Sequence, residues 1–184
     1  MGKVYDRIDE RLTGWIGAQH VFFVATAPDR GGHVNCSPKG LRSLRVLGER
    51  EVAYLDFIGS GAETLAHLRQ NGRITLMFCA FEGPPDIVRL HGKGEVVEPG
   101  DPGWETLAAA FEPGENARSI VRVRVERISD SCGYGVPLMA FQKERTQLDD
   151  WAARKSPEQL RQYQLDNNLG SLDGLPALRG EQIR

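Results

Sequence analysis

The chain has 184 residues, which is enough for one domain with a substantial hydrophobic core and too few for two domains of ordinary size. Its 23 basic and 25 acidic residues nearly cancel, and 40% of the residues are hydrophobic, as in an ordinary globular protein. This balance argues against nucleic acid or an anionic membrane as a partner, and we expect a small molecule or another protein instead.

The N-terminal half is predicted to begin with a helix and to continue with strands. Apolar residues at helical spacing predict a helix over residues 4–17. Short runs rich in β-branched and aromatic residues, separated by turn residues, predict strands at 20–26, 33–40 and 51–57. A second helix is expected to start near Ser60 and to end at Gly72, because Asn71-Gly72 supplies a left-handed cap.

The C-terminal half is predicted to add three strands and three helices. ITLMFCAF (74–81) is apolar on both faces and predicts a buried strand, whereas the glycines of IVRLHGKGEVV (87–97) predict a strand with a bulge or a sharp bend. IVRVRVERI (120–128) alternates as a half-buried strand does, with Arg122 and Arg124 on its solvated face. Helices are predicted at 103–111, 140–155 and 157–167, the last with Ser156 as N-cap and Pro157 at its first position.

Six predicted strands joined mostly by short connections do not fit a doubly wound parallel sheet. They favour an antiparallel barrel with helices packed outside it. The three cysteines, Cys36, Cys79 and Cys132, form no CxxC pair, and the N-terminal stretch MGKVYDRIDERL is charged throughout. We therefore expect a reducing, cytoplasmic setting.

Four stretches of the sequence have the order and spacing of a known family: VNCSPKG, YLDFIGSGAETLAHLRQNGRITLMF, IVRLHGKGEVV and the strand that ends in ISDSCGYGVP. They resemble the pyridoxamine 5′-phosphate oxidase-like group, the FMN-binding split barrels, over roughly residues 18 to 130. The resemblance implies a mainly β fold, a six-stranded antiparallel split barrel with flanking helices, over residues 1–138. Residues 139–184 resemble an extension found in one uncharacterised branch, and we expect them to form a helical extension packed on the same domain.

The resemblance also implies a homodimer that binds FMN in two clefts at the subunit interface, where basic and hydroxyl side chains hold the phosphate. An oxidoreductase of unknown substrate is then the expected activity, and no side chain is assigned as acid or base. The implied cofactor-binding residues come from the second strand, from the turn and helix after the third strand, and from the fifth strand. They are Asn35, Ser37, Lys39, Asp56, Ser60, Gly61, Thr64 and Arg89.

The sequence departs from the family pattern at two places. Oxidases of the family have a basic pair just after the Gly-Ser turn, where this chain has Gly61, Ala62 and Glu63. A carboxylate there repels a phosphate by an amount on the order of 1 kcal/mol. The family's C-terminal Trp and Arg-x-Pro segment is also absent, so we do not expect pyridoxamine phosphate oxidation.

Several alternatives remain open at this stage. Ser60 and Glu63 have the spacing of a capping box, which would satisfy the helix start without any ligand. Some split-barrel relatives bind haem, so the four histidines, His20, His33, His67 and His91, keep a haem-binding or haem-degrading protein as an alternative. F420 is a further candidate cofactor, and a cofactor-free dimer whose C-terminal extension docks a partner is the third hypothesis. No histidine pair has zinc-site spacing, so no metal site is expected.

Overall fold

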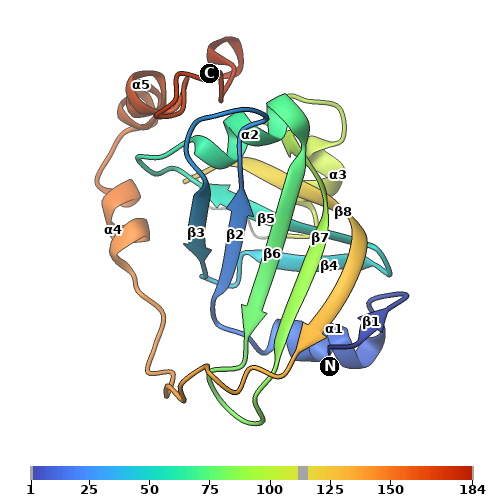
Figure 1. Ribbon diagram of the computed structural model, residues 1–184. Coiled ribbons are helices and arrows are strands. Elements are labelled where there is room, and N and C mark those ends of the chain that lie inside the picture. The colour runs from blue at the N-terminus through green and yellow to red at the C-terminus, as the bar shows by residue number, and fades with distance from the viewer. Residues whose placement is uncertain (1, 112–115, 184) are drawn as a thin grey trace.

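One antiparallel sheet dominates the computed structural model, which describes residues 2–111 and 116–183 (Figure 1). The strands follow the order β3-β2-β6-β7-β8-β5-β4, and β1 pairs with β8 outside this path. Their bounds are β1 Val4–Tyr5, β2 Phe22–Thr26, β3 Asn35–Lys39, β4 Leu44–Gly48, β5 Glu51–Phe57, β6 Arg73–Cys79, β7 Ile87–Val97 and β8 Ala117–Ser131. The mainly β split-barrel class predicted from the sequence is confirmed, with eight strands in the described residues where six were predicted.

Helices cover the two ends of the barrel and one outer side. Their bounds are α1 Glu10–Gly17, α2 Glu63–Asn71, α3 Trp104–Ala108, α4 Gln147–Ala153 and α5 Pro157–Asn167, with a short 3-10 helix at Gly180–Gln182. In Figure 1, α1 lies at one end of the barrel, whereas α2 lies at the other end, near α5 and the C-terminus. No helix in the described ranges is long and apolar enough to cross a membrane.

Alternate residues of the strands fill the inside of the barrel. Val24, Leu76 and Leu90 lie on three neighbouring strands and are fully buried, together with Tyr54 on β5. The α2 helix closes this core with Leu65. Burying a side chain of this size contributes about 1.5–3 kcal/mol, so the period-two pattern of the strands accounts for the barrel.

A β-bulge interrupts the pairing of the long β7 strand at its glycines, but the extra residue, Glu126, lies on the partner strand β8 and not on β7 as predicted. The pairing of β7 with β8 shifts register between His91 and Gly92. A Cβ atom on Gly92 would lie only 2.1 Å from the carbonyl oxygen of Arg124, so only glycine fits there without a backbone shift. The bulge lets the two longest strands curve together around the barrel.

Three sequence predictions of secondary structure are wrong. Val4 and Tyr5 form β1 on the edge of β8, so the first helix begins only at Glu10, after the N-cap Asp9. The short strand β4 was not predicted, because its alternation is brief and half-buried. The helix predicted over 140–155 begins at 147, after an extended segment without regular structure.

The C-terminal segment packs back on the barrel. Ser156 and Gln159 form a capping box at the start of α5, as the N-cap prediction requires. Leu160 of α5 packs with Ile58 and Ala152. The carboxylate of Glu98, on the turn after β7, accepts hydrogen bonds from Arg69 on α2 and from Arg179, so the chain end is tied to the same end of the barrel.

Candidate functional site

A closed network of hydroxyl and amide groups lies inside the barrel beneath α2. The Asn35 amide nitrogen donates to Thr64 Oγ1 at 3.0 Å and to Thr26 Oγ1 at 3.3 Å, and the Ser37 hydroxyl donates to Asn35 Oδ1 at 2.9 Å. Thr26 Oγ1 also lies 2.9 Å from Nδ1 of His67. The structure therefore brings the predicted residues Asn35, Ser37 and Thr64 together, and each of them has a hydrogen-bond partner in the protein.

Asp56 is the centre of a second, charged cluster. Its carboxylate has no exposed surface, and its oxygens lie 2.7 Å from Lys39 Nζ and 2.8 Å from Arg118 Nε. Burial alone would raise the pKa of Asp56, but Arg118 and Lys39 together outweigh it and lower this pKa to about 2. The three side chains carry two positive charges and one negative charge, so the cluster keeps a net positive charge.

Arg118, which the sequence did not single out, holds this cluster against the turn before α2. Asp56 pairs with Ser119 and Phe57 pairs with Ala117, so Arg118 is the extra residue of a β-bulge. The bulge re-aims its guanidinium, which also donates to the carbonyl oxygen of Gly61 at 2.7 Å. Strand alternation alone gave no signal for this orientation.

The capping box that the sequence left open as an alternative at Ser60 and Glu63 is not present at the start of α2. The N-cap residue is Ala62, which has no side-chain hydrogen bond, and Ser60 lies exposed before it. The Glu63 carboxylate instead accepts a hydrogen bond of 3.2 Å from the backbone N–H of Leu172 and lies beside Gly61. No side chain of the N-cap residue therefore bonds to the backbone N–H groups of the first turn, the end of a helix that attracts anions.

Arg89 lies on the other face of the sheet from the two clusters. In the cross-strand register, Pro38 faces Phe23, Phe23 faces Met77, and Met77 faces Arg89. Residues paired in this way share a face, and Lys39, next to Pro38, points to the opposite face. Arg89 donates to Ser131 Oγ at 2.9 Å on this outer face. Within one chain it therefore does not join the other predicted residues.

Each of the four histidines has a protein partner. His67 has no exposed surface, and burial lowers the pKa of its ring despite the opposing charges of Asp173 and Glu63. The other three contacts are a stack of His20 on Phe141 at 3.5 Å, a 2.7 Å ion-pair contact of His33 with Asp173, and a 3.1 Å contact of His91 with Thr75 Oγ1. The buried His67 ring is not accessible to a haem iron.

The C-terminal extension covers the start of α2, a feature that the sequence did not predict. The Asp173 carboxylate accepts a hydrogen bond from the backbone N–H of His33 and contacts the ring of His33. The side-chain amide of Asn168 donates to the carbonyl oxygen of Gly59 at 2.8 Å. With the bond from Leu172 to Glu63, these contacts place the segment 168–173 over the turn. Over residues 2–111 and 116–183, no group of three or more potential metal ligands was found.

Comparisons with known proteins identify relatives of this chain. The family model described as pyridoxamine 5′-phosphate oxidase matches residues 8–132. The pyridoxamine 5′-phosphate oxidase family protein ustO of Aspergillus flavus is 38% identical, over 95% of this chain and 77% of that protein.

Two solved structures are similar in fold. HupZ of Group A Streptococcus has a TM-score of 0.52 and 25% identity, and the match covers 66% of this chain and 91% of HupZ. A candidate pyridoxamine 5′-phosphate oxidase of Lactobacillus delbrueckii has a TM-score of 0.52 and 21% identity, over 68% of this chain and 98% of that chain.

Proposed function

The chain belongs to the pyridoxamine 5′-phosphate oxidase family, and on that premise we propose that it is a flavin-dependent oxidoreductase that binds FMN. The observation that supports this most directly is the uncapped start of α2, which lies beside the net positive cluster of Lys39, Asp56 and Arg118. Both features favour a phosphate group, because the N-terminus of a helix and positively charged side chains each attract anions.

The residues around this turn fit a phosphate in chemical type. Lys39 has three N–H donors, of which Asp56 takes one, and its side chain is 20% exposed. Ser60 adds an exposed hydroxyl, and Gly61 is exposed beside it, although a carboxylate oxygen of Glu63 lies 2.6 Å from the position that a Cβ atom of Gly61 would take. Glu63 opposes phosphate binding because its carboxylate is negatively charged. This carboxylate does not cap the helix, since it accepts a hydrogen bond from the backbone N–H of Leu172. These residues would hold the phosphate, and the bound flavin would supply electron or hydride transfer.

The proposal includes a homodimer with the cofactor at the subunit interface. The outer face of the sheet supports it, because half-buried Phe23 and Met77 lie there beside exposed Pro38 and the partly buried Arg89. A second copy that packs on this face would bury its apolar groups and bring Arg89 to the interface. We also propose that the protein acts in the cytoplasm and that pyridoxamine 5′-phosphate is not its substrate.

A fluorescence titration of FMN tests the proposal. We expect FMN fluorescence to be quenched saturably by the wild-type chain, and Lys39→Ala to weaken binding about tenfold or more. Lys143→Ala is the matched control, because Lys143 is exposed on the segment between β8 and α4. Circular dichroism checks that each variant is folded. Absence of saturable FMN binding would overturn the flavin proposal, and equal affinities of the two variants would remove Lys39 from the site.

A further inference from the structure

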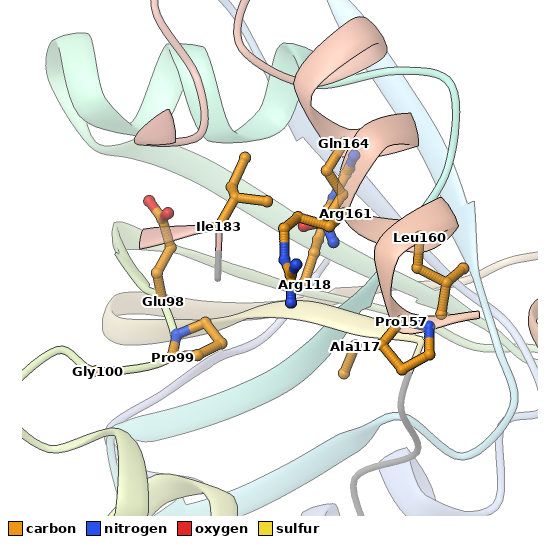
Figure 2. A pocket seen from close by; sticks show the side chains of 10 residues that line it. All are labelled: Glu98, Pro99, Gly100, Ala117, Arg118, Pro157, Leu160, Arg161, Gln164 and Ile183. Carbon is orange, nitrogen blue, oxygen red and sulfur yellow. The ribbon is translucent and has the colours of Figure 1, made fainter. Parts of the chain in front are cut away.

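A cavity separates α5 from the barrel and is distinct from the turn before α2. Its volume is about 660 Å³, and it lies between the turn after β7, the start of β8, one face of α5 and the chain end (Figure 2). The α5 residues that line it are Pro157, Leu160, Arg161 and Gln164, the spacing of a single helical face. Cavities of this size hold small organic molecules, whereas a single inorganic ion would leave most of the space empty.

Two guanidinium groups line this cavity. Arg118 reaches it from β8, and its hydrogen bonds to Asp56, Gly59 and Gly61 use three of its five N–H groups. Arg161 reaches it from α5, and Figure 2 shows both arginines near the middle of the cavity. Two positive groups in one cavity repel each other, and an anion between them would be attracted to both.

Arg161 has one long contact with an acidic side chain, and its own side chain is 36% exposed. Its Nε atom is buried and makes no hydrogen bond to any described residue. Its nearest acidic group is Glu158, at 3.8 Å, and that side chain is 81% exposed. A buried N–H of a charged group without an acceptor is costly, so an acceptor brought by a ligand would be favoured.

The acidic group that lines the cavity does not neutralise the arginines. Glu98 shares its carboxylate with Arg69 and Arg179, and in Figure 2 this carboxylate points away from Pro157 and Ala117. The remaining walls are largely apolar. At the start of α5 the capping box uses the backbone N–H groups of Ser156 and Gln159, and Pro157 has no N–H group.

From this combination we propose that the cavity under α5 binds a small organic anion, a carboxylate or phosphate monoester with an apolar body. The anionic group lies between Arg118 and Arg161, and the body packs on Leu160, Pro99 and Ile183. The cavity shares Arg118 with the cluster beside the proposed flavin site, but its other lining residues differ, and the proposal does not depend on flavin binding.

Three probes of similar shape test the proposal on the full chain: benzoate, phenyl phosphate and the neutral benzyl alcohol. NMR titration should shift the Arg161 Nε–H signal and the methyl signals of Leu160 and Ile183 with one or both anions. Arg161→Gln should weaken anion binding about tenfold or more and leave benzyl alcohol unaffected. Arg154→Gln is the matched control, because Arg154 is exposed at the end of α4 and does not line the cavity.

The outcomes separate this site from the flavin site. Saturable binding of either anion that depends on Arg161 and survives an excess of FMN would support the proposal, and the responding probe would distinguish a carboxylate from a phosphate site. The proposal would be overturned if neither anion binds saturably, if Arg161→Gln binds as tightly as the control, or if benzyl alcohol binds equally well. Displacement of the bound anion by FMN, read at the same methyl signals, would make the cavity the flavin site and would also overturn the proposal.

Discussion

Replacing Asp56 with asparagine would leave Lys39 and Arg118 without the carboxylate that both contact inside the barrel. Removing one partner of a buried charge cluster costs about 3–5 kcal/mol, because the remaining charges stay buried. Part of this cost depends on pH. The pKa of Asp56 falls from 3.8 to about 2 on folding, which corresponds to about 2 kcal/mol of stability.

The sign of the pH dependence follows from this lowered pKa. Asp56 contributes fully to the free energy of unfolding above pH 3.8, the pKa of the carboxyl group in the unfolded chain. This contribution is lost as the pH falls towards 2. In urea unfolding followed by tryptophan fluorescence, the free energy of unfolding of Asp56→Asn should be about 3–5 kcal/mol below that of the wild type at neutral pH. This difference should narrow by about 2 kcal/mol between pH 5 and pH 2. Asp6→Asn, at an exposed position, is the control. A deficit below about 1 kcal/mol at neutral pH, or one that does not change with pH, would refute this reasoning.

Three further substitutions probe the phosphate turn, the chain end and the β7 bulge. Glu63→Gln should strengthen FMN binding roughly fivefold, or by about 1 kcal/mol, because it removes a negative charge beside the proposed phosphate. An unchanged affinity in the fluorescence titration would place the phosphate elsewhere. Glu98→Gln should lower the free energy of unfolding by about 3 kcal/mol, because it removes the buried charge that Arg69 and Arg179 share. It should also make the segment after α5 more sensitive to limited proteolysis, and an unchanged cleavage rate would contradict this role. Gly92→Ala should lower the free energy of unfolding by about 2 kcal/mol or more, because its Cβ would meet the backbone of Arg124, whereas Gly48→Ala, with open space around it, serves as the control. Equal stability of the two glycine variants would contradict the close approach at Gly92.

Local signals in the sequence predicted the elements that local chemistry determines. The capping box and Pro157 mark the start of α5, and Gly72 ends α2 with a φ of 70°, the left-handed value that glycine favours. In each case the residues that define the element lie within a few positions of one another.

The features that the sequence missed depend on contacts between distant residues. Asp56 meets Arg118, 62 residues further along the chain, and a bulge aims the arginine against the strand alternation. The capping box, one of the two alternatives for Ser60, does not form, and Glu63 instead contacts Leu172, 109 residues away. The resemblance grouped Arg89 with Lys39, but only the register of the folded sheet reveals that they lie on opposite faces.

The most direct test of the flavin assignment is the visible absorption spectrum of the freshly purified protein, followed by addition of FMN. The account predicts a yellow protein, or a colourless one that takes up FMN saturably with one molecule per chain. A colourless protein that leaves both the spectrum and the fluorescence of added FMN unchanged would contradict it.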